Sequence, residues 1–95
     1  MKLKNITGTS DKTCACDSWL DHWEKFSGKK ASTCGVLTCN NKAEVGAHVR
    51  KVGGYDFAAY IYPLCDVCNQ ATGELEVWDG FPLVSADPSE TCEKQ

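Results

Sequence analysis

The chain has 95 residues, seven of them cysteine, and a formal net charge of -3. A chain of this length forms one small domain, residues 1–95, whose modest core often needs a staple such as a metal ion. No apolar run approaches the roughly 18 residues of a membrane span, and the N-terminus lacks the apolar stretch of a secretory signal. We therefore expect a cytoplasmic protein without membrane contact.

The charges are distributed unevenly along the chain. Residues 1–65 contain nine Lys or Arg and six Asp or Glu, whereas residues 66–95 contain one and seven, which gives +3 and -6. Only the first part could face phosphate. We place a nucleic-acid or protein contact within residues 25–62, and its candidate cations are Lys25, Lys29, Lys30, Lys42, Arg50 and Lys51.

The N-terminal third is predicted to contain one helix. Residues 1–13 are polar, and we expect them to be flexible unless another element ties them down. Within residues 14–30, Ser18 is the predicted N-cap of the helix and Gly28 its C-terminal stop. An apolar stripe for core packing is formed by Trp19, Leu20, Trp23 and Phe26.

Short strands and turns are predicted from residue 34 onward. Two β-rich segments, residues 43–49 and 58–64, flank a Gly-Gly turn and predict a β-hairpin. Alternation along the first strand places His48 on the face opposite its apolar row. A turn or two of helix is expected before Gly73, followed in residues 74–95 by a small strand pair and a C-terminal tail.

Four cysteines are spaced as two pairs around this hairpin. Cys34 and Cys39 form a C-x4-C turn, and Cys65 and Cys68 form a C-x2-C turn. Closely spaced pairs reach tetrahedral geometry around Zn²⁺ because each pair comes from one tight turn. Within residues 34–73 the spacing therefore predicts a zinc-stabilised core of a small α+β domain. Disulfides and an iron–sulfur site are the alternatives.

A second cysteine group involves both ends of the chain. Cys14 and Cys16 precede His22 in a C-x-C-x5-H pattern, and Cys92 could return from the tail as a fourth ligand. These four residues would make a second Zn²⁺ site, so we expect one zinc ion and allow for two. The alternatives are a disulfide from Cys92 to Cys14 or Cys16, or free thiols.

The pattern C-x4-C, AHV and YPLC-x2-CN, over residues 34–73, resembles the zinc-containing subset of HNH endonucleases. This resemblance implies a treble-clef (ββα-metal) core; a zinc ribbon is the structural alternative. It also implies that His48 is the general base and that Asn69, after the last cysteine, is a ligand of a catalytic divalent metal. The family's Asp before the base is Ala47 here, and its middle Asn is Tyr60.

Three functions follow from these motifs. The first is a zinc-binding module with a degraded catalytic site that binds nucleic acid or protein. The second is an active HNH-type endonuclease that uses a catalytic divalent metal and His48. The third is a zinc-thiolate redox sensor centred on Cys14, Cys16 and Cys92.

Overall fold

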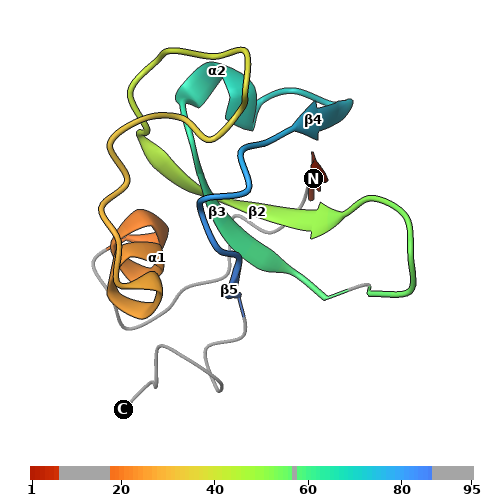
Figure 1. Cartoon of the computed structure of the whole chain (residues 1–95), viewed down its shortest axis with the longest axis horizontal. Coiled ribbons are helices and arrows are strands. Elements are labelled where there is room, and N and C mark those ends of the chain that lie inside the picture. Colours follow the sequence, from red (N-terminus) through yellow and green to blue (C-terminus); the bar gives the residue numbers. More distant parts are fainter. Residues whose placement is uncertain (7–17, 57, 87–95) are drawn as a thin grey trace.

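The computed structural model describes residues 1–6, 18–56 and 58–86 and shows a small α+β domain built on one antiparallel sheet. The strand order is β4-β1-β2-β3-β5. The elements are β1 (Lys2–Asn5), α1 (Trp19–Ser27), β2 (Val45–Lys51), β3 (Tyr60–Leu64), α2 (Asp66–Asn69), β4 (Glu74–Glu76) and β5 (Val84–Ser85). Figure 1 shows α1 to the left of the sheet and the short α2 at the top of the view. The buried apolar side chains of the described residues form one cluster, so these elements share one core.

The N-terminal segment is tied down, which corrects our expectation for its first residues. Residues Lys2–Asn5 form β1, which lies between β2 and β4 in the sheet. Leu3 is fully buried in the core, opposite Lys51 on one side and Leu75 on the other. The apolar burial of one leucine and two rows of backbone hydrogen bonds hold the strand in place. Residues 7–13 lie outside the described residues.

The predicted helix is confirmed with both of its ends. Ser18 is the N-cap of α1, and its hydroxyl accepts a hydrogen bond from the Asp21 N–H at 3.1 Å. Gly28 ends the helix in the left-handed conformation, with φ of 75°. Trp23 is fully buried, whereas Phe26 at the end of the stripe is 38% exposed.

The predicted hairpin is confirmed, and the structure adds its register. In strands β2 and β3, Val45 lies opposite Leu64 and His48 lies opposite Ile61. Gly53 and Gly54, in the connecting loop, both have positive φ, which explains the Gly-Gly pair.

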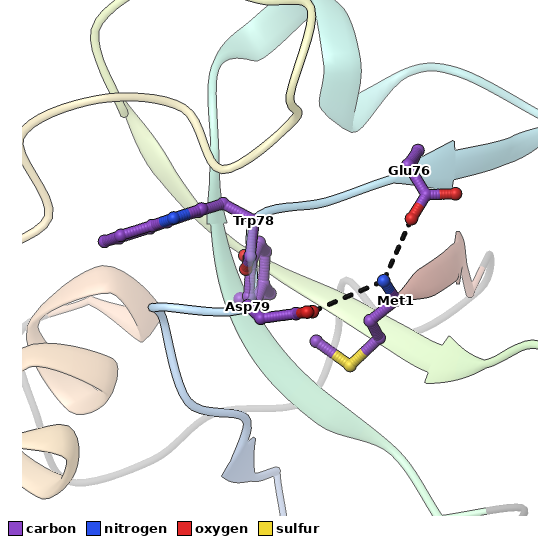
Figure 2. Close-up of polar contacts among 5 residues, drawn as sticks. Met1, Glu76, Trp78 and Asp79 are labelled. Atoms are coloured by element: carbon purple, nitrogen blue, oxygen red, sulfur yellow. Dashed lines mark hydrogen bonds and ion pairs between the residues drawn. The ribbon is translucent and has the colours of Figure 1, made fainter.

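The last two strands are present, but they are not partners. Strand β4 pairs with β1, and β5 pairs with β3, so they occupy opposite edges of the sheet. The expected strand pair is therefore wrong. The amino group of Met1 lies between the carboxylates of Glu76 and Asp79, at 2.9 and 3.3 Å, and joins the ends of β1 and β4 (Figure 2).

The helical turn near the second cysteine pair is short. Strand β3 ends at Leu64, and α2 begins at Asp66 and ends at Asn69, with Gln70 as its C-cap.

Within the described parts of the chain, no helix is long and apolar enough to cross a membrane.

Candidate metal centre

The four predicted cysteines meet at one point in the structure. The sulfur atoms of Cys34, Cys39, Cys65 and Cys68 all lie within 4.8 Å of one another, and none of these cysteines forms a disulfide. Two of the four, Cys34 and Cys65, are buried, at 4% and 1% exposure. This cluster could hold a metal ion.

The first pair is positioned by a turn that is anchored at both ends. The Cys34 N–H donates to the Asn41 carbonyl at 2.9 Å, and the Cys39 N–H donates to the Val36 carbonyl at 3.0 Å. Val36 also forms an isolated bridge with Val77, next to β4. The turn is thus closed by its own backbone bonds, and the bridge at Val36 fixes it beside β4.

The second pair is positioned by the start of α2. Cys65 is the N-cap of this helix, and its sulfur accepts from the Cys68 N–H at 3.4 Å. The side chain of Asn5 in β1 donates to the carbonyls of Cys68 and Ala71, at 2.9 and 3.0 Å. Because Asn5 lies opposite Val49, these bonds place α2 over the sheet face that carries Val49.

The distances fit a tetrahedral ion. With Zn–S bonds of about 2.3 Å, the edge of a regular sulfur tetrahedron is about 3.8 Å. The sulfur atoms of Cys39 and Cys65 lie 3.7 Å apart. Four sulfur donors within 4.8 Å of one another, drawn from two tight turns, suit a soft or borderline metal rather than Mg²⁺ or Ca²⁺.

The thiols of the cluster differ in acidity. Burial raises the pKa of the Cys34 and Cys68 thiols. Burial also acts to raise the pKa of Cys65, but hydrogen bonds from the Cys68 N–H and the Asn41 amide outweigh it and lower the pKa to about 6. Of these three thiols, Cys65 is therefore the first to become a thiolate, the form that binds a metal.

Asn41 is a residue of this site that the cysteine spacing did not identify. Its side-chain amide is 3.6 Å from the Cys65 sulfur, and its carbonyl accepts the Cys34 N–H. It therefore contacts both cysteine turns, as outer-shell partners of metal ligands do. The only signal in the sequence is an Asn two residues after Cys39, which is also an ordinary turn residue.

Only His22 of the predicted second site lies among the described residues. It is fully buried on α1, where a surface position is more usual, and its Nε2 atom is 3.0 Å from the Ser85 carbonyl oxygen. Its ring packs between Trp19 and Phe26, at centroid distances of 4.8 and 5.1 Å. The other three predicted ligands lie outside the described residues: Cys14, Cys16 and Cys92.

The two predicted catalytic residues lie on different elements. His48, in β2, points to the face covered by α1, where its ring meets Trp19 edge-on at 4.6 Å. Asn69 is the last residue of α2, and its N–H donates to the Cys65 carbonyl. Among the residues that the structure describes, the four cysteines are the only group of three or more His, Cys, Asp or Glu side chains close enough to hold a metal.

Comparison with known proteins gives no match: no family model, curated protein or solved structure is similar to this chain.

Proposed function

We propose that the chain is a zinc-stabilised binding module on an HNH-like scaffold that lacks a working catalytic site. The observation that carries the proposal is the convergence of four sulfur atoms within 4.8 Å, with a Cys39–Cys65 distance of 3.7 Å. Zn²⁺ is the common ion for a closed site with four cysteine ligands. Such a site has no open position for substrate, so its role is structural.

The order of the elements supports the HNH-like scaffold. The first cysteine turn is followed by the β2–β3 hairpin and then by α2, which carries the second pair. This is the order of a treble clef in which the last helix is one turn long. A zinc ribbon remains the alternative, because β4 begins at Glu74, only a few residues after Asn69.

The surroundings of His48 favour binding over catalysis. Hydrolysis of a phosphodiester by this family requires a divalent metal next to the base. The residue before His48 is Ala47, which offers no ligand, and the His48 ring lies against Trp19. The residues present therefore do not fit a catalytic metal at His48, and we assign the histidine to packing between β2 and α1.

Two measurements test this proposal. Elemental analysis of the purified protein should find bound zinc. The Cys39→Ser variant should contain less zinc per chain, because the site of Cys34, Cys39, Cys65 and Cys68 loses a ligand. A plasmid-nicking assay with Mg²⁺, Mn²⁺, Ni²⁺ and Zn²⁺ should show no cleavage above that of the His48→Ala variant. Cleavage that depends on His48 would replace the binding module with a nuclease.

A further inference from the structure

An open groove of about 460 Å³ runs along the first cysteine turn, and two of the metal-site cysteines, Cys34 and Cys39, belong to its lining. Trp78 and Phe81 complete the lining from the segment after β4. The volume lies in the range of small-molecule sites, about 300–1,000 Å³. Among the described residues that line the groove, none is Asp, Glu, Lys or Arg.

Trp78 forms a fixed aromatic surface in this groove. Trp78 is 51% exposed, yet its indole is held in place by its neighbours. The Phe81 ring meets it edge-on at 4.9 Å, and a Cβ on Gly80 would lie 2.1 Å from the indole ring, so the ring rests directly on the glycine. Because the indole is already ordered, a flat ligand can stack on it at a low cost in conformational entropy.

Positive charge lies in the chain segment that supplies most of the groove lining. Residues 28–43 contain no Asp or Glu and three exposed lysines, Lys29, Lys30 and Lys42. Lys42 lies directly opposite Thr33, a lining residue, in an isolated antiparallel bridge. The Lys30 ammonium lies 3.8 Å from the Glu24 carboxylate. Because the Lys30 side chain is 90% exposed, this ion pair contributes little to stability.

The acidic side chains next to Trp78 in the sequence face the other way. Figure 2 shows the indole extending away from Asp79, whose carboxylate points to the Met1 amino group together with that of Glu76. A tetrathiolate zinc site carries about -2 and weakens anion binding nearby. Cys34 and Cys39 of that site line the groove, so the lysines must outweigh its charge for an anion to bind there.

We infer that this groove binds a nucleobase that carries a phosphate, with the base stacked on Trp78 and the phosphate held by the lysines near Thr33. An exposed aromatic side chain, with lysines on the neighbouring segment, matches a ligand that is flat and apolar at one end and anionic at the other. A free nucleotide and an exposed nucleotide of a single strand share this chemistry. The inference rests on the proposed function, because the metal centre holds the wall that contains Cys34 and Cys39.

The test uses zinc-loaded, ¹⁵N-labelled full-length protein and follows the indole N–H signal of Trp78 in an NMR titration. The probes are AMP, a hexadeoxyadenylate strand, adenosine without phosphate and ribose 5-phosphate without a base. AMP or the strand should shift the Trp78 signal, and adenosine and ribose 5-phosphate should each bind at least about fivefold more weakly. A shift by the strand alone assigns the site to single-stranded nucleic acid, and a shift by both probes assigns it to nucleotides generally.

Variants separate the stacking surface from the cations. Trp78→Ala should weaken binding about tenfold or more, whereas Trp78→Phe should retain most of it. Lys42→Gln should weaken binding severalfold and flatten the salt dependence, whose slope for a single strand is about -0.7 per phosphate contact. Tyr55→Ala is the matched control, because Tyr55 is 96% exposed on the hairpin loop and should leave binding unchanged.

Zinc content is measured for every variant, so that the two proposals fail separately. A chain that binds no zinc contradicts the proposed function. A zinc-loaded chain whose Trp78 signal is unmoved by AMP and by the strand contradicts only the nucleotide site. The site is also overturned if adenosine binds as tightly as AMP, or if an arginine-containing peptide shifts Trp78 where neither nucleotide probe does.

Discussion

The backbone of α1 at Trp19 rests directly on Gly46 of β2. A Cβ added to Gly46 would lie 2.4 Å from the carbonyl carbon of Trp19 and 2.6 Å from the Leu20 nitrogen. Contacts under 3.0 Å do not occur for real Cβ atoms, and the opposing atoms here are backbone, which cannot rotate away. The missing side chain of Gly46 therefore sets how closely the helix approaches the sheet.

Gly46→Ala should lower the free energy of unfolding by about 2 kcal/mol or more, because either α1 or β2 must shift to admit the methyl group. Chemical denaturation of the zinc-loaded protein measures the change. Gly73→Ala is the control, since nothing lies within 4 Å of its Cβ position and its φ is not positive. Equal stabilities for the two variants would contradict the close packing of α1 on β2.

Removing the metal should unfold the region around the four cysteines. Two of the cysteines are buried, and the backbone of both cysteine turns is hydrogen-bonded around the cluster. The free energy of metal binding at such a site is also free energy of folding. Far-ultraviolet circular dichroism during titration with a strong chelator should show loss of structure that returns when Zn²⁺ is added in excess. A spectrum unchanged after complete metal removal would show that the sheet stands without the ion.

Asn41→Ala should weaken zinc binding by about 10- to 100-fold, the range found for outer-shell partners of metal ligands. The substitution removes the N–H···S contact of 3.6 Å to Cys65 and leaves the backbone bond to Cys34. Competition with a chromogenic chelator gives the affinity. Asn40→Ala changes the exposed neighbouring residue and should leave the affinity at the wild-type value; a parallel loss in both variants would contradict the role of Asn41.

Tyr62→Phe should alter how stability depends on alkaline pH. Burial raises the pKa of the Tyr62 hydroxyl, which donates to the Trp78 carbonyl at 2.6 Å. A pKa raised in the folded state gives stability that is complete below the unfolded value, about 10, and declines as the pH rises above it. The free energy of unfolding of the wild type should fall from pH 10 to 11 more steeply than that of Tyr62→Phe.

The same variant should cost about 1 kcal/mol at neutral pH, because the Trp78 carbonyl loses its hydrogen-bond donor. Urea denaturation at pH 7 and at several values above pH 9 supplies both comparisons. Parallel pH curves for the two proteins would mean that the Tyr62 hydroxyl titrates alike in the folded and unfolded chain.

Local signals in the sequence were enough for the features that depend on local geometry. Ser18 and Gly28 mark the two ends of α1, because the free backbone groups at a helix end are satisfied by the residues next to it. The Gly53-Gly54 turn and the alternation before it predicted the hairpin, and cysteine spacing predicted the cluster. Each of these features is set by residues a few positions apart or by a strict ligand count.

Features that depend on long-range contacts were missed. Strand β1 offers one apolar residue, Leu3, among Lys and Asn, so its sequence has no strand pattern of its own. Strand β5 has two residues, and its pairing with β3 depends on where the chain returns after Phe81. The burial of His22 depends on Ser85, 63 residues away, which no periodicity along α1 could indicate.

The position of β1 in the sheet has a consequence for how the chain is made. Leu3 lies between Lys51 and Leu75, so β1 gains both of its neighbours only after β4 has been synthesised. Pairings across such long separations are entropically costly and slow to form. A nascent chain stalled before β4 would leave one edge of β1 unpaired, and such an edge can pair with another chain.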